Sequence, residues 1–71
     1  MTIESNTIFI NGEPLNYIHS MSLHDLIEYL DFNVDTVIIE CNQQIIPRNK
    51  LNTVLCKHQD RLEIITIVGG G

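Results

Sequence analysis

The residues best suited to chemistry stand at the end of the sequence, where ITIVGGG places Gly69, Gly70 and Gly71 after a run of branched apolar residues. Glycine has no Cβ, so it passes through a channel too narrow for any other residue. Such a segment can deliver a terminal carboxylate into the active site of another protein. There the carboxylate can be activated as a mixed anhydride with AMP, and its acyl carbon can then accept a thiol, a persulfide or an amine. We therefore expect Gly71 to be modified, with Gly69 and Gly70 as the threaded segment.

A glycine tail needs a separate docking surface, because ordering three glycines costs roughly 3 to 6 kcal/mol at about 1 to 2 kcal/mol per residue. Alternation along RLEIITIV predicts a strand with two faces, one carrying Leu62, Ile64 and Val68, the other carrying Glu63, Ile65 and Ile67. If one helix covers one face of the sheet, the second set remains exposed and can contact a partner. Two plainer interpretations stay open: a central strand that is apolar on both faces, and a tail that is an ordinary frayed terminus.

The tail must be carried by a folded domain, whose first element is a predicted β-hairpin. TIFI is a β-branched and aromatic run, and it is followed by Asn11-Gly12, a dipeptide that favours a two-residue hairpin turn. The second strand is predicted over about residues 13 to 18. Pro14 cannot donate to a strand ladder, which places this second strand at a sheet edge.

The segment SLHDLIEYLDF predicts one amphipathic helix. Its apolar residues recur with helical spacing, at Leu23, Leu26, Ile27 and Leu30. Ser22 is the predicted N-cap, with Asp25 completing a weak capping box, and Asn33 is the expected left-handed stop. The apolar stripe is narrow, so we expect the helix to lie on a sheet.

The remaining segments predict a third strand in TVIIECN and a short fourth strand in QQII. PRNKL predicts a helical turn with Pro47 at its first position, and NTVL is short and extended. CKHQD is a connection, and RLEIITIV is the last strand. With the last strand inserted beside the first, this order predicts an α+β fold of the β-grasp, ubiquitin-like type, with a mixed sheet of four to five strands and one main helix. A ferredoxin-like fold is the alternative, but it requires a second full helix. We divide the chain into a frayed extension (1–6), the β-grasp domain (7–68) and a flexible glycine tail (69–71).

Composition narrows the classes of partner. Four Lys and Arg against nine Asp and Glu give a formal charge of -5, without a basic run, which argues against nucleic acid and anionic membranes. Cys41 and Cys56 belong to no metal or disulfide motif, so we expect two small buried hydrophobic side chains in a reducing compartment. The three histidines lack metal-ligand spacing, and we expect no bound metal.

With INGEPL, SLHDLIEYL, NQQIIPR and EIITIVGGG, the chain resembles the ThiS family, the sulfur carrier proteins of thiamine thiazole biosynthesis. The resemblance runs from about Thr7 to Gly71. It implies a carrier that is not itself an enzyme, acting as a monomer in the cytoplasm or the plastid stroma. In KHQD, only Asp60 remains of the family's usual Asp-Gly-Asp turn, so either Gln59 takes the left-handed position at some energetic cost or the turn has a different shape.

The resemblance also implies the partners. An ATP-dependent adenylyltransferase of the ThiF type, related to ubiquitin-activating enzymes, adenylates Gly71, and a cysteine desulfurase supplies sulfur that converts the carboxylate to a thiocarboxylate. Thiazole synthase (ThiG type) then takes the sulfur. No cofactor is bound by the carrier, and ATP is bound by the adenylyltransferase.

Two other functions remain compatible with the sequence. The small subunit of molybdopterin synthase shares the Gly-Gly end and the thiocarboxylate chemistry, although that family tends to be longer. A ubiquitin-like modifier or a plain interaction module is the third possibility, in which the tail forms an amide with a lysine or does not react.

Overall fold

The computed structural model describes residues 5–67, so Val68 and the predicted tail residues Gly69, Gly70 and Gly71 lie outside the described part. The elements follow in the order β1 (Asn6–Ile10), β2 (Glu13–Tyr17), α1 (Leu23–Tyr29), a 3-10 turn η1 (Val34–Thr36), β3 (Val37–Cys41), β4 (Gln44–Ile46), a second 3-10 turn η2 (Arg48–Lys50) and β5 (Arg61–Thr66). β1 begins one residue before the expected domain start at residue 7, because Asn6 already pairs with Tyr17.

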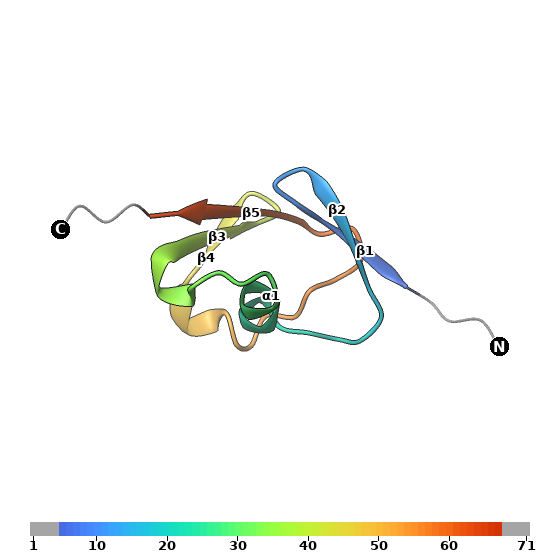
Figure 1. The fold of residues 1–71 in the computed structure, drawn as a ribbon, viewed down its shortest axis with the longest axis horizontal. Helices are drawn as coiled ribbons and strands as arrows, with labels where there is room; N and C mark the ends of the chain where they lie inside the picture. The colour runs from blue at the N-terminus through green and yellow to red at the C-terminus, as the bar shows by residue number, and fades with distance from the viewer. Residues whose placement is uncertain (1–4, 68–71) are drawn as a thin grey trace.

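The five strands form one mixed sheet in the order β2-β1-β5-β3-β4, and α1 crosses one of its faces (Figure 1). β5 is central, parallel to β1 and antiparallel to β3. β2 lies at the edge, where the missing N–H of Pro14 removes no ladder hydrogen bond with a further strand. The arrangement confirms the predicted β-grasp fold.

Three turns use left-handed backbone at residues other than glycine. The first hairpin turns at Asn11 (φ 50°) and Gly12 (φ 86°), as predicted from that dipeptide. Of the two alternatives for the KHQD turn, the structure has the first, with Gln59 left-handed at φ 71°. The β3–β4 hairpin turns at Asn42 (φ 52°) and Gln43 (φ 71°), which the sequence did not indicate because no glycine stands there. Gln43 is thereby removed from the predicted fourth strand.

The helix begins as predicted, with both hydrogen bonds of the capping box between Ser22 and Asp25. Its predicted stop was wrong: Asp31, not Asn33, is left-handed, with φ 66°. The helix already ends at Tyr29, and an aspartate tolerates this conformation. Asn33 is extended and caps η1 instead, where its Oδ1 accepts a hydrogen bond from the N–H of Asp35 at 2.9 Å.

Two smaller expectations also need correction. Pro47 precedes the first residue of η2 as its cap, instead of opening the helical turn. NTVL is not extended throughout: Thr53 donates its backbone N–H to the Lys50 carbonyl in a turn, and only Leu55 forms an isolated bridge, with Ser22. Compact turns suffice here because this segment only has to return the chain to the start of β5.

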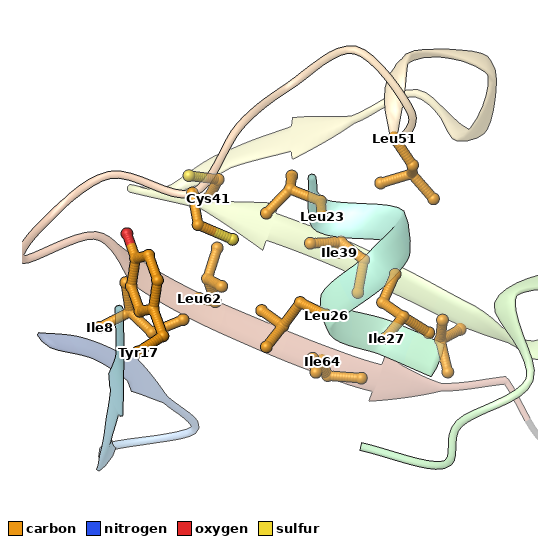
Figure 2. Packing of buried hydrophobic residues seen from close by; sticks show 12 residues of the cluster. Ile8, Tyr17, Leu23, Leu26, Ile27, Ile39, Cys41, Leu51, Leu62 and Ile64 are labelled. Atoms are coloured by element: carbon orange, nitrogen blue, oxygen red, sulfur yellow. The ribbon is translucent and has the colours of Figure 1, made fainter. Parts of the chain in front are cut away.

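The core fills the space between α1 and the sheet (Figure 2). The helix contributes Leu23, Leu26 and Ile27, each at most 1% exposed. In Figure 2 these side chains face Leu62 and Ile39 on the sheet. Because α1 covers only this face, outward-pointing side chains of the central strands have no cover from the helix.

Candidate functional site

β5 is the element that leads toward the predicted tail, and its two faces differ. Leu62 and Ile64 are 1% and 7% exposed, whereas Ile65 and Ile67 are 46% and 44% exposed. Glu63 is also exposed. The expected division of the strand into a core face and an open face is therefore confirmed for these residues, while their role in docking stays a prediction.

The open face carries an apolar patch built from three strands. Ile65 lies directly opposite Ile38 of β3, and Ile45, 67% exposed, lies on β4. We call Ile38, Ile45, Ile65 and Ile67 the outer patch. Exposed branched side chains grouped on one face are typical of a surface that contacts another protein. The sequence indicated only Ile65 and Ile67, because strand register decides which residues of β3 and β4 join them.

Two carboxylates lie beside the outer patch. Glu63 of β5 is directly opposite Glu40 of β3, and like charges in that position destabilise a sheet. Within residues 5–67, the one contact of a basic side chain with a carboxylate inside 4.0 Å joins His24 Nδ1 to Glu28 Oε1 at 3.2 Å, on α1. The guanidinium of Arg61 instead lies 4.8 Å from the centre of the Phe9 ring. The open face thus combines apolar side chains with two opposed carboxylates that make no salt bridge within residues 5–67.

The end of β5 is held on both sides. On the β3 side, the N–H of Ile67 donates to the carbonyl of Thr36 at 2.7 Å. On the β1 side, the Asn11 side chain accepts a hydrogen bond from the N–H of Ile64 at 2.9 Å and donates one to its carbonyl at 3.4 Å. Sequence reasoning identified Asn11 as a turn residue and missed this second contact, which joins residues 53 positions apart.

The start of β5 is held by a polar cluster around Asp60, which is 9% exposed. Its carboxylate accepts hydrogen bonds from the Lys57 N–H at 2.8 Å and from Asn42 Nδ2 at 3.0 Å. Asn42 Oδ1 in turn accepts from the Arg61 N–H at 3.0 Å. The buried carboxylate is therefore satisfied from two sides, by Lys57 of the loop before β5 and by Asn42 of the β3–β4 turn, and it joins these two turns, neither of which contains glycine.

Arg48, the last residue of the NQQIIPR segment, has a structural role. Its Nε donates to the carbonyl of Val34 at 3.3 Å, and its Nη2 donates to that of Val37 at 3.2 Å. The side chain therefore ties the turn after β4 to the start of β3. That contact stabilises the strand that carries Ile38.

Both cysteines are free and buried, as expected. Burial, with a smaller contribution from Asp60, raises the pKa of the Cys56 thiol to about 11. Burial and, to a smaller extent, the negative charge of Asp60 also raise the pKa of the Cys41 thiol. Both thiols are therefore protonated at neutral pH, which makes them poor nucleophiles. Burial and the raised pKa values argue against either thiol as the site that carries sulfur.

Neither a metal centre nor a membrane span is found in the described residues. No group of three or more His, Cys, Asp and Glu side chains within residues 5–67 is arranged to hold a metal ion. The same part of the chain has no helix with the length and apolar character needed to cross a bilayer.

The chain matches one protein family, and its relatives include both short chains of similar length and one much longer protein. The sequence model of the ThiS family matches residues 8–71. "Uncharacterized protein ycf40" of Pyropia yezoensis is 47% identical over 70 residues, which is 97% of this chain and 99% of that one. The protein of the same name from Porphyra purpurea is 46% identical over 65 residues, 92% of each chain.

A further relative is much longer. "Thiazole synthase" of Paramagnetospirillum magneticum is 34% identical over 64 residues, covering 90% of this chain but only 20% of that polypeptide. Among solved structures, the crystal structure of the thiamine biosynthesis protein (ThiS) from Geobacter metallireducens superposes with a TM-score of 0.79. It is 24% identical, and the match covers 92% of this chain and 99% of that chain. At this identity the structural match establishes the fold.

Proposed function

This chain belongs to the ThiS family, whose match spans residues 8–71, and from that premise we propose that it carries sulfur as a thiocarboxylate on the carboxyl group of Gly71. ThiS proteins are small sulfur carriers of thiamine biosynthesis and are not catalysts. The proposal assigns Gly71 as the modified residue and Gly69 and Gly70 as the segment that enters the partner. All three glycines lie within the range that the family match covers.

The chemistry requires a partner that binds ATP. In the proposed first step, a carboxylate oxygen of Gly71 attacks the α-phosphate of ATP on a ThiF-type adenylyltransferase, and pyrophosphate leaves. A persulfide sulfur from a cysteine desulfurase then attacks the acyl carbon, AMP leaves, and reduction of the acyl persulfide by a thiol releases the thiocarboxylate. The carrier contributes the acyl group and the surface by which it is recognised.

The observation that carries the proposal is that exposed isoleucines of the outer patch come shortly before the glycine tail in the sequence. Ile65 in β5 and Ile67 directly after its end are nearly half exposed, and both precede the glycines in the sequence. A partner that holds this patch would receive the tail at its active site. Docking by Ile65, Ile67 and Glu63 would offset the entropy lost when the glycines are ordered.

The long relative supports thiazole synthase as the consumer of the sulfur. In Paramagnetospirillum magneticum the matching segment makes up 20% of a polypeptide named thiazole synthase. A carrier-like segment within a synthase chain is what we expect where the two parts act on each other. We further propose a reducing compartment, the cytoplasm or the plastid stroma, which agrees with two free and buried cysteines.

The test is mass spectrometry of the C-terminal tryptic peptide after incubation with ATP, a ThiF-type adenylyltransferase, a desulfurase, cysteine and a thiol reductant. Cleavage after Arg61 yields LEIITIVGGG, which contains neither Cys nor Met. Replacement of one oxygen by sulfur in this peptide therefore cannot be confused with oxidation of methionine or with sulfur on Cys41 or Cys56. We expect that replacement in the wild-type chain.

Two variants provide the control. Deletion of Gly71, and extension by one alanine after it, leave residues 5–67 unchanged and should abolish loading. Normal loading of the extended chain would contradict the proposal. A wild-type peptide that stays unchanged, with the same enzymes active on another ThiS protein, would favour a modifier or an interaction module, and consumption by a molybdopterin synthase would reassign the pathway.

A further inference from the structure

The ladder between β1 and β5 stops before β5 does. Its register pairs Phe9 with Arg61 and Ile10 with Leu62, and the N–H of Asn11 then donates to the Leu62 carbonyl at 2.8 Å. After Asn11 the backbone turns away into the hairpin. β5 continues to Thr66. Ile64 therefore lies beyond the end of β1 and has no β1 strand residue as its partner.

The side chain of Asn11 occupies that position. Its Oδ1 accepts a hydrogen bond from the Ile64 N–H at 2.9 Å, and its Nδ2 donates to the Ile64 carbonyl at 3.4 Å. A carboxamide offers the same acceptor and donor as a peptide group. Asn11 thus adds one more pair to the ladder from a turn residue whose backbone, at φ 50°, has already left the strand.

This contact lies immediately before the residues that we propose to dock. Ile64 is followed by Ile65, and the Ile67 N–H is held from the opposite side by Thr36 at 2.7 Å. Together these two contacts hold the backbone of the segment that carries the exposed Ile65 and Ile67. We infer that Asn11 is a positioning residue for sulfur loading: its amide holds β5 so that Ile65, Ile67 and the tail reach the adenylating partner together. This inference rests on the proposed function.

The chain contains a matched residue at the opposite end of β5. Asn42 also stands at the first position of a hairpin turn with a positive φ of 52°, and its Oδ1 accepts from the Arg61 N–H at 3.0 Å. Asn42 therefore holds β5 by a similar contact, but at the end that is remote from the tail. If Asn11 only stabilised the fold, variants at the two positions would have the same kind of effect.

The test compares Asn11→Gly with Asn42→Gly. Glycine tolerates positive φ, so both turns can persist while each loses its amide. Three quantities are measured: the free energy of unfolding in urea, the exchange rate of the Ile64 amide hydrogen by NMR, and KM and kcat for ATP-dependent loading by a ThiF-type adenylyltransferase and a desulfurase. We expect both variants to be less stable than the wild type, yet folded.

Only Asn11→Gly should change KM for loading markedly. Loss of two hydrogen bonds predicts faster Ile64 exchange and a KM raised about tenfold, with kcat nearly unchanged, because the reacting carboxylate itself is intact. Asn42→Gly should leave KM within about twofold of the wild-type value. Asn11→Asp keeps the acceptor for the Ile64 N–H but loses the donor, so its KM should lie between those of the wild type and Asn11→Gly.

The outcomes separate the two proposals. A similar rise of KM in both glycine variants, or an unchanged KM in Asn11→Gly, would overturn the positioning role while the proposed function stands. If the wild type is not loaded by enzymes that load another carrier, the proposed function fails, and the positioning role fails with it.

Discussion

At the scale of single residues, the pairing of Glu40 with Glu63 places two like charges opposite each other in the sheet. The two residues are directly opposite on the open face, beside the outer patch. A sheet is destabilised by about 0.2 to 1 kcal/mol when like charges hold such positions. If Glu63 docks as proposed, a partner that presents Lys or Arg at this point would relieve the repulsion, and the pair would then favour the complex.

Glu63→Gln should therefore have opposite effects on folding and on docking. We expect the free energy of unfolding to rise by about 0.2 to 1 kcal/mol, since the repulsion with Glu40 is removed, and KM for loading to increase severalfold. Urea denaturation and loading kinetics measure the two effects. Glu28→Gln on α1 is the control, with KM expected unchanged. A Glu63→Gln variant that docks as well as the wild type would exclude this residue from the interface.

The buried Cys56 thiol predicts how stability depends on pH. Its pKa is raised by burial to about 11, above its ordinary value of 9.0, so deprotonation is easier in the unfolded chain. The contribution of this group to stability is complete below pH 9.0 and decreases as the pH rises toward about 11. Raised pKa values of Cys41 and Tyr17 act in the same direction.

Urea midpoints measured across that alkaline range test the Cys56 prediction. The wild type should lose stability as pH rises, and Cys56→Ala, although less stable at neutral pH, should show a weaker dependence. Equal pH dependence in the two proteins would mean that the thiol does not contribute. Sulfur loading at neutral pH should persist in Cys56→Ala, because the proposed chemistry takes place at Gly71.

At the scale of elements, α1 stabilises the sheet without contributing to the proposed interface. Its start is held by Ser22, whose Oγ accepts from the Asp25 N–H at 3.1 Å, while the Asp25 carboxylate accepts from the Ser22 N–H at 3.4 Å. Its buried residues cover the core face of β5. The open face of the same strand is left for a partner.

Ser22→Ala should separate folding from loading. Loss of the cap is expected to lower the free energy of unfolding by about 1 kcal/mol, measured in urea, while KM for loading stays at the wild-type value. Ser22 is 7% exposed and remote in sequence from the outer patch. A raised KM in this variant, at a temperature where it is fully folded, would show that the helix contributes to docking.

At the scale of the whole molecule, charge is unevenly distributed along the chain. All four Lys and Arg lie between positions 48 and 61, whereas seven of the nine Asp and Glu precede position 48. Because the net charge is -5, a partner with a basic docking surface would be attracted before contact. Salt screens such attraction, with a Debye length of about 10 Å at 0.1 M ionic strength.

Loading should accordingly depend on salt and on the outer patch in different ways. We expect kcat/KM for loading to fall as NaCl is raised. Ile65→Ala should lower kcat/KM about tenfold at every salt concentration, because it removes apolar contact and no charge. Ile18→Ala is the matched control, since Ile18 is 57% exposed but lies outside the outer patch. Equal losses in the two variants would argue against a specific patch.

Much of the fold follows from signals that are local in the sequence. Helical spacing located α1, the Ser22 and Asp25 pair located its start, and Asn11-Gly12 located the first hairpin. Alternation along β5 separated Leu62 and Ile64 from Ile65 and Ile67. These signals act over a few residues, where backbone sterics and side-chain direction depend little on the rest of the chain.

Only the tertiary structure decided what surrounds β5. The contact of Asn11 with Ile64 spans 53 positions, and the pairings of Ile38 with Ile65 and of Glu40 with Glu63 follow from the register of β3 on β5. Register depends on how the core packs and on where each strand ends, and a shift by one residue would turn every side chain to the other face. The sequence alone therefore determined the elements and indicated the reactive tail, whereas packing decided which residues hold β5 and which join the outer patch.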